Sequence, residues 1–249
     1  MGIGRVASAR ISADGSRLEE VKTIYEGLYP RRIVQTPDGR LLVSTMDATG
    51  DSAQKLDKVA GKILRLNADG SPAGDSALAK TAGARPEIYT LGHRDPDGMT
   101  LDKASGQVWL TEHGPRGGDE LNLVRGGGNY GFPTISYGRQ YDGQLINAGK
   151  TVQAGLEQPV YFWDPDIAPS GLTVYRGGMF PAWKGDIFIA SLVGKTLVRL
   201  QMKDGKVAGE EPVLAGRCER HRDVSQGPDG ALYVLTDGPT AAVLRLSKP

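Results

Sequence analysis

Three arginines carry the side chains best suited to binding a negatively charged ligand. Arg220 and Arg222 flank His221 in a short segment of β character, and Arg94 lies far from them in the sequence. Residues two apart in a strand point to the same side, so Arg220 and Arg222 are expected to project together. Guanidinium groups bind carboxylates and phosphates through paired hydrogen bonds. The pattern therefore indicates a site for a ligand with several anionic groups, which Arg94 would join from a neighbouring repeat.

Carboxylates in the same segments offer a second interpretation of these arginines. Ion pairs with them would satisfy the guanidinium groups without any ligand. The available partners are Asp95, Asp97, Asp166 and Asp223. Spacing alone leaves both interpretations open.

The segment from Glu112 to Pro133, EHGPRGGDELNLVRGGGNYGFP, is rich in glycine and in oxygen ligands. Calcium binds carboxylates and backbone carbonyls in a flexible shell. The segment lacks the spacing of an EF-hand, and an ordinary glycine-rich loop is the alternative. The candidate donors are Gly114, Pro115, Asp119, Glu120 and Tyr130.

Other site chemistries find no support in the sequence. The three histidines, His93, His113 and His221, lack zinc-type spacing to one another or to Cys218. Cys218 is the one cysteine, so an intrachain disulfide is excluded. There is no phosphate-binding loop and no serine nucleophile motif.

The elements that must position these residues form a repeat. Four apolar strands, each preceded by a glycine-containing turn, are expected at Leu41–Thr45, Val108–Glu112, Asp186–Ser191 and Ala231–Asp237. A more polar strand precedes each of them, a third strand follows, and a fourth usually ends the unit, as in EIYTLG, PVYFW and EPVLAG. Four-stranded antiparallel units repeated around an axis make a β-propeller. A β-sandwich is the alternative, but it would not need the same motif in every unit.

The chain ends indicate incomplete units. Two strands come first, three full units follow, and three strands close the chain, giving about 17 strands in a single all-β domain over residues 1–249. A strand from the N-terminus would complete the last unit if the ring closes, and otherwise the ring stays open. An open ring exposes two strand edges that favour a homodimer.

The first strand of each propeller blade lines the central channel, and the loops that lead into it form a funnel on one face. Ligand sites belong in such a funnel. The loops are residues 27–32, 91–98, 163–171 and 215–223, where the polar and charged residues concentrate. The one long insertion, Gly126–Gln158, lies between the third and fourth strands of the second full unit.

Composition excludes several broad classes of protein. With 30 Lys+Arg and 29 Asp+Glu among 249 residues, the net charge of +1 argues against a nucleic-acid binder that works by charge alone. No segment is apolar for the roughly 18 residues that a membrane span needs. The first fifteen residues have no apolar core, so no signal peptide is expected in the chain as given.

Five segments together resemble the soluble quinoprotein aldose (glucose/sorbosone) dehydrogenases. They are LGHRDPDGMTLD, TEHGPRGGDELNLVRGGGNYGFP, DIAPSGLTVY, RHRDVSQGPDGALYVLTD and GKILRLNADGS, and they span nearly the whole chain. The resemblance implies a six-bladed propeller, a periplasmic or secreted location, and the cofactors pyrroloquinoline quinone (PQQ) and Ca2+.

The resemblance also implies roles for residues that bind the quinone and its calcium. Arg94 matches an arginine that contacts the quinone, and Arg220 with Arg222 matches the pair that binds its carboxylates and carbonyls. Gly114 and Pro115 match the backbone carbonyls that hold the calcium of the cofactor.

Three further residues match functional positions of the family. Glu120 and Tyr130 resemble ligands of a second, structural calcium. Asp47 matches the aspartate that orients the catalytic histidine.

Four positions depart from the family pattern. The catalytic histidine of the family falls on Leu28, which cannot accept a proton. Asp95 and Asp97 stand at cofactor-binding positions where the family has Asn and Gln, and Asp166 replaces a Ser or Thr. Extra carboxylates beside an anionic cofactor are unfavourable unless calcium or arginine compensates. Six blades would also need about 24 strands, so at least one blade is missing here.

The function implied by the resemblance is oxidation of the C1 hydroxyl of an aldose sugar to a lactone, with electrons passed to an external acceptor. A base must replace the missing histidine, and Asp47 or a funnel aspartate is the hypothesis. Two alternatives stay open: a non-catalytic propeller that binds a ligand or partner, and a calcium-dependent lactonase that uses Asp95, Asp97 and Asp166.

Overall fold

The computed structural model describes residues 4–217 and 219–248, with only the backbone of Leu28; Cys218 lies outside them. The described residues form 17 strands in five antiparallel sheets, with three short 3₁₀ helices and no α-helix. The first sheet is a hairpin of β1 (Gly4–Ile11) and β2 (Leu18–Leu28). The first four-stranded sheet contains β3 (Pro30–Gln35), β4 (Leu41–Thr45), β5 (Lys62–Leu66) and β6 (Ile88–Leu91). None of the helices has the length and apolarity needed to cross a bilayer.

The remaining three sheets repeat the same order of strands. The second four-stranded sheet contains β7 (Pro96–Asp102), β8 (Gln107–Glu112), β9 (Asp119–Val124) and β10 (Tyr161–Trp163). The third contains β11 (Pro169–Val174), β12 (Ile187–Ser191), β13 (Leu197–Lys203) and β14 (Lys206–Pro212). The last has only β15 (Arg220–Gln226), β16 (Leu232–Asp237) and β17 (Val243–Leu246).

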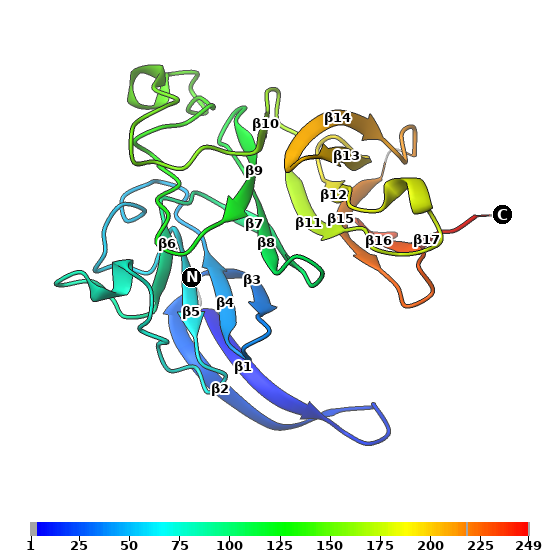
Figure 1. The fold of residues 1–249 in the computed structure, drawn as a ribbon, viewed down its shortest axis with the longest axis horizontal. Helices are drawn as coiled ribbons and strands as arrows, with labels where there is room; N and C mark the ends of the chain where they lie inside the picture. Colours follow the sequence, from blue (N-terminus) through cyan, green and yellow to red (C-terminus); the bar gives the residue numbers. More distant parts are fainter. Residues whose placement is uncertain (1–3, 218, 249) are drawn as a thin grey trace.

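This arrangement is a β-propeller of four-stranded blades, as the repeat predicts. The sheets follow one another in chain order, and the hairpin β1–β2 lies beside the first complete blade (Figure 1). The two strands at the start, three complete blades and three strands at the end match the expected order. The long insertion also lies where expected, between β9 and β10. β1 pairs with β2 alone, so it does not complete the last sheet.

One strand lies earlier than expected. The segment EPVLAG suggests a fourth strand at residues 211–216, whereas β14 runs from Lys206 to Pro212. Asp204 and Gly205 both have positive φ, and Lys203 pairs with Lys206 across this two-residue turn. Such a turn sends the chain straight back along β13, so the fourth strand begins at once.

The core consists of apolar layers between neighbouring blades. Leu42 and Ile63 of the first complete blade pack against Met99 and Leu110 of the second. Similar clusters join the second blade to the third and the third to the last. Because the central strands are covered on both faces, they read as unbroken apolar runs, and every residue of β12 is buried.

The inner strands approach one another so closely that two positions admit only glycine. A Cβ on Gly98 would lie 2.0 Å from the carbonyl oxygen of Ser170, and a Cβ on Gly171 would lie 1.7 Å from a carboxylate oxygen of Asp223. Hydroxyl groups tie the same blades together. Ser44 Oγ donates to the carbonyl of Pro96, and Thr111 Oγ1 donates to that of Ser170.

Every inner strand has a shift in register near its start. The shifts fall between Pro30 and Ile33, Pro96 and Gly98, Pro169 and Leu172, and His221 and Asp223. Bulges of this kind redirect side chains and are common beside functional sites. The residues inside them are Arg31, Arg32, Asp97, Ser170, Gly171 and Arg222.

The first complete blade leaves part of its packing face uncovered. Ile33 of β3 is 51% exposed, while the equivalent Met99, Leu172 and Val224 are between 3% and 8% exposed. The hairpin β1–β2 packs against this side through Val6, but no inner strand accompanies it. The expectation of a homodimer through open edges stays a prediction.

Substitution of Gly171 by alanine is expected to destabilise the fold by about 1–3 kcal/mol, because the new methyl group would collide with Asp223. Gly178→Ala in the same blade is the matched control, since no atom lies within 4 Å of a Cβ there. Urea unfolding of both variants would measure the difference. Equal unfolding midpoints would show that the inner strands can move apart freely.

Candidate functional site

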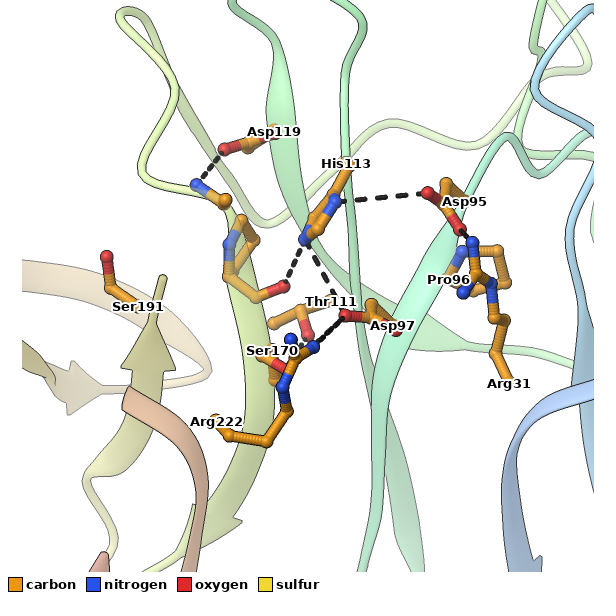
Figure 2. Close-up of polar contacts among 12 residues, drawn as sticks. Arg31, Asp95, Pro96, Asp97, Thr111, His113, Asp119, Ser170, Ser191 and Arg222 are labelled. Carbon is orange, nitrogen blue, oxygen red and sulfur yellow. Dashed lines mark hydrogen bonds and ion pairs between the residues drawn. The ribbon is translucent and has the colours of Figure 1, made fainter. Parts of the chain in front are cut away.

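His113, at the end of strand β8, is the centre of a polar network in the funnel (Figure 2). Its Nε2 lies 2.8 Å from the carbonyl oxygen of Pro169 on the next inner strand. Its ring nitrogens also lie 3.9 Å from Asp95 and 4.0 Å from Asp97. The spacing of the histidines in the sequence tests His113 only as a zinc ligand and does not predict this position.

Asp95 is enclosed between His113 and an arginine from the preceding blade. Arg31 Nη2 lies 2.8 Å from Asp95 Oδ1. Burial raises the pKa of the Asp95 carboxyl, although the charges of Arg31 and His113 oppose that shift. Asp95 is therefore a carboxylate with increased affinity for a proton, held in the funnel.

Arg220 and Arg222 project together, as expected, and converge on one carboxylate. Arg222 Nη2 donates to Asp237 Oδ2 at 2.8 Å, and Arg220 Nε donates to the same oxygen at 3.3 Å. Arg222 Nη1 also reaches Asp97 Oδ2 at 3.3 Å. Hydrogen bonds from both arginines lower the pKa of Asp237. The ion pair of Arg222 with Asp97 agrees with the interpretation that carboxylates of the chain satisfy the arginines. Asp237, the partner that both arginines share, was not among the expected carboxylates.

A second ion pair crosses the channel between the first and last inner strands. Arg32 Nη1 donates to Asp223 Oδ2 at 2.8 Å, and Arg32 Nε donates to the carbonyl of Asp97. The two charged residues are equivalent in their strands to Gly98 and Gly171. Because these two glycines carry no side chain, the neighbouring inner strands leave space for the Arg32–Asp223 ion pair.

Arg94 is buried and directed towards the glycine-rich segment. Its Nη1 donates to the carbonyls of His113 and Gly114, at 2.9 Å each. Its Nε is buried and has no partner in the described part of the chain. Arg94 therefore joins Arg222 indirectly, through His113 and Asp97.

Asp47 holds its own loop together. Its Oδ1 accepts hydrogen bonds from Thr49 Oγ1 and Gly50 N, and its Oδ2 accepts one from Ser52 N at 2.7 Å. Its backbone N–H donates to the carbonyl of Arg94. Both carboxylate oxygens are thus engaged, and the contact with Arg94 is made by the backbone.

Two carboxylates line a small space in the second blade, and one amide bonds to both of them. Asn122 Nδ2 donates to Glu112 Oε1 at 2.8 Å and to Glu120 Oε2 at 3.0 Å. Asn122 is fully buried, and its Oδ1 has no partner among the described residues. The space beside Glu112, Glu120 and Tyr130 has a volume of about 20 Å³, room for one water-sized species.

The charges around this space are unbalanced. Burial, followed by the negative charge of Glu112, raises the pKa of Glu120 to about 8. Glu112 itself accepts hydrogen bonds from Arg94 N and approaches His93 Nδ1 at 3.0 Å. A buried carboxylate, a half-buried one and an unpaired amide oxygen are a donor set that suits a hard cation.

The other candidate calcium donors differ in availability. The hydroxyl of Tyr130 donates to the carbonyl of Leu123 and accepts from Arg125 N, whereas its backbone carbonyl accepts no hydrogen bond in the described part of the chain. The Gly114 carbonyl accepts from Arg94, and that of Pro115 accepts no hydrogen bond within the described residues. Asp119 accepts backbone N–H groups of Gly114, Ile167 and Ala168, so it shapes the loop instead.

The position equivalent to Glu120 in the first complete blade is occupied by a lysine. Ser44 pairs with Ile63 and Thr111 pairs with Leu121, so Lys62 corresponds to Glu120. Lys62 Nζ donates to the carbonyls of Ser52, Ala53 and Ala60, at 2.8–2.9 Å. Burial lowers the pKa of Lys62 to about 8, and the charge of Asp47 opposes the shift.

The remaining sequence expectations concern Leu28, His221 and zinc. The backbone of Leu28 ends β2 and pairs with Gly4, at the entry to the funnel. His221 is fully buried between its flanking arginines, and neither ring nitrogen has a partner among the described residues. The described residues contain no group of three or more His, Cys, Asp or Glu side chains placed to hold a metal.

Without a cation, stability is expected to fall as pH rises from about 5 to about 8. The unfolded chain loses the Glu120 proton near its ordinary pKa of 4.5, whereas the folded chain keeps it up to about 8. Urea unfolding at several pH values in a chelator would measure this slope. Glu120→Gln should flatten it, and Glu211→Gln at an exposed site should not. Identical slopes in all three proteins would contradict the burial of an ionisable Glu120.

Comparison with known proteins agrees with this fold. Aldose sugar dehydrogenase YliI of Escherichia coli is 37% identical over 252 residues, covering 97% of this chain and 68% of that protein. A crystal structure of a glucose dehydrogenase superposes with a TM-score of 0.92 at 39% identity, over 98% of this chain and 73% of that one.

A structure with the quinone bound is also similar. The PQQ-bound aldose sugar dehydrogenase from Streptomyces coelicolor has a TM-score of 0.75 and 26% identity, over 98% of this chain and 71% of that chain. The family model for glucose/sorbosone dehydrogenase matches residues 2–245. The chain therefore belongs to the glucose/sorbosone dehydrogenase family of sugar oxidoreductases.

Proposed function

We propose that this chain oxidises the C1 hydroxyl of aldose sugars to lactones, with PQQ and Ca2+ as cofactors and an external electron acceptor. The observation that carries the proposal is the convergence of Arg94, Arg220 and Arg222 on one funnel network in a chain of this family. A location in the periplasm or outside the cell would suit such an enzyme.

The residues of the funnel fit an anionic quinone. Arg94 has a buried Nε with no partner in the described part of the chain, so it retains a hydrogen bond to give. Arg220 and Arg222 are each partly exposed and can bind carboxylates while they remain near Asp237. Gly114 and Pro115 would offer carbonyl oxygens to the calcium of the cofactor. When bound, the quinone would accept hydride and the calcium would polarise its carbonyl.

The carboxylates that depart from the family pattern are compensated by neighbouring cations. Asp95 is paired with Arg31, and Asp97 with Arg222. Paired carboxylates add little net negative charge to the funnel, so they need not repel an anionic cofactor. Asp95 and Asp97 would then orient the arginines and the cofactor edge.

Asp95 is the best candidate for the base that removes the C1 hydroxyl proton. Leu28 cannot accept a proton, and both oxygens of Asp47 are engaged by its own loop. Asp95 lies in the funnel with a raised pKa, which increases its affinity for a proton. Asp47 would act by holding the loop that contacts the Arg94 backbone.

A second calcium would be structural. Glu120, Glu112, the amide oxygen of Asn122 and the carbonyl of Tyr130 would form the donor set, and a divalent ion would neutralise the two carboxylates. Bound there, it would fix the start of β9 and the segment that carries Gly114 and Pro115.

The two alternatives receive less support from the contacts. A lactonase calcium would need Asp95, Asp97 and Asp166 to converge, but Asp95 faces Arg31, Asp97 faces Arg222 and Asp166 accepts Gly117 N. A purely binding propeller would use the same arginines, and only turnover distinguishes it from an enzyme.

Calorimetric titration with PQQ should show binding in excess calcium and weak or no binding in a chelator. Arg222→Gln should weaken the binding about tenfold or more, because a charged hydrogen bond is lost. Arg245→Gln is the control, since Arg245 pairs with Asp229 on the last sheet away from the funnel. A folded wild-type chain that does not bind PQQ would refute the proposed cofactor.

Asp95→Asn should lower kcat of the PQQ-loaded protein by about 10²–10⁴-fold, the usual loss when a general base is removed. Quinone affinity should change much less, because asparagine is the residue that the family carries at this position. Dye-linked aldose oxidation measures kcat, and calorimetry measures the affinity. Unchanged kcat would exclude Asp95 as the base.

A further inference from the structure

We propose that Lys62 is a positioning residue for the quinone site, and that its buried ammonium group fixes the backbone of Arg94 through the loop of residues 46–61. The proposal rests on the function proposed above, because Arg94 is the arginine that would contact the quinone. Lys62 itself would touch neither the sugar nor the cofactor.

The ammonium group of Lys62 is fully buried, and its hydrogen bonds go to backbone carbonyls. Nζ donates to Ser52 O at 2.8 Å, to Ala53 O at 2.9 Å and to Ala60 O at 2.8 Å. An ammonium group has three N–H donors, so each donor has one carbonyl. Burial of a cation is unfavourable unless such bonds compensate it, and these bonds last only while the loop keeps its shape.

The loop that Lys62 binds has no helix or strand of its own. It connects β4 to β5, and Lys62 is the first residue of β5. The side chain of Lys62 therefore reaches back over the loop that precedes it. Asp47 binds the same loop near its start, because Asp47 Oδ2 accepts the N–H of Ser52 at 2.7 Å. Ser52 is thus held on its N–H by Asp47 and on its carbonyl by Lys62.

The same loop holds the segment that leads into β7. Gly92 N donates to Ala53 O at 3.0 Å, and His93 N donates to Gly61 O at 3.1 Å. The N–H of Asp47 donates to the carbonyl of Arg94 at 2.7 Å. A Cβ on Gly61 would lie 2.7 Å from the carbonyl oxygen of His93, so loop and segment are in close contact. The Ala53 carbonyl links them directly, since it accepts from both Gly92 and Lys62.

Arg94 is therefore placed between this loop and the second blade. From the second blade, Glu112 accepts the N–H of Arg94, and the carbonyl of His113 accepts its Nη1. Loss of the Lys62 ammonium would leave three carbonyls without their donor, and the loop would rearrange to reach water. The Arg94 backbone would move with it, and a small displacement of a binding group is costly to ligand binding.

Calorimetric titration with PQQ in excess calcium at pH 7 tests the effect on the quinone site. Lys62→Ala and Lys62→Met should each weaken PQQ binding about tenfold or more. Lys62→Met keeps most of the side-chain volume, so it serves as the test if the alanine variant does not fold. Val198→Ala, in the core between the second and third blades, is the control, because it lowers stability away from the loop and should leave PQQ affinity unchanged.

Chemical rescue separates the charge of Lys62 from its volume. Propylammonium carries the atoms that Lys62→Ala lacks, and propan-1-ol has a similar shape without the charge. An excess of propylammonium should restore PQQ affinity to within about threefold of wild type, whereas propan-1-ol should not. Equal effects of the two compounds, including no effect from either, would overturn the role assigned to the ammonium group.

Hydrogen exchange tests the same contacts without the cofactor. The amides of Asp47, Gly92 and His93 should exchange about tenfold faster in either Lys62 variant than in wild type, because the loop no longer fixes their bonds. Unchanged exchange at all three amides would show that Lys62 does not hold the Arg94 segment.

Failure of the wild-type chain to bind PQQ would refute the proposed function and, with it, any role of Lys62 in quinone binding. Hydrogen exchange would still decide whether Lys62 fixes the backbone of Arg94. Normal PQQ binding by wild type, with the same affinity in both Lys62 variants, would refute this inference alone.

Discussion

The close approach of the inner strands is the constraint on which the rest of the molecule depends. Gly98 and Gly171 allow neighbouring strands to lie so near each other that no side chain fits between them. That approach aligns the bulges at the start of each inner strand, and the bulges direct Arg31, Asp97 and Arg222 into the funnel. The site is thus a product of backbone packing: a wider channel would separate the ion pairs that cross it.

Charge balance gives the funnel its chemical character. Three of its arginines pair with carboxylates of other blades: Arg31 with Asp95, Arg32 with Asp223 and Arg222 with Asp97. Such pairs fix the side chains in position before a ligand arrives, and preorganised donors lose less entropy on binding. The carboxylates Glu112 and Glu120 are the exception, because the described residues supply them with an amide and the ring of His93 but with no lysine or arginine ion pair.

The sequence was sufficient to predict most of the strands, because most are short apolar runs between glycine turns; the polar strand β14 is the exception. The strand Leu41–Thr45 and the insertion before β10 lie where expected, and Arg220 and Arg222 project together as expected, although a bulge at Arg222 interrupts the alternation of β15. Contacts between blades could not be predicted in this way. His113, Asp237 and the pairing of Glu112 with Glu120 depend on cross-strand register and on bulges, which a single sequence does not display. The direction of the Tyr130 hydroxyl depends likewise on how the insertion folds back.

The correspondence of Lys62 with Glu120 has a consequence for how this repeat could change over time. At one structural position, one blade carries its own ammonium ion and the next carries a carboxylate that suits an ion from solution. The ammonium group of Lys62 is attached to the chain and cannot diffuse away, whereas occupancy beside Glu120 would depend on the ion concentration in solution. Each side chain depends on its own surroundings, because Lys62 is held by three loop carbonyls and Glu120 lies beside Asn122 and Glu112. Because the blade is repeated, one protein can carry a lysine at this position in one blade and a glutamate in the next.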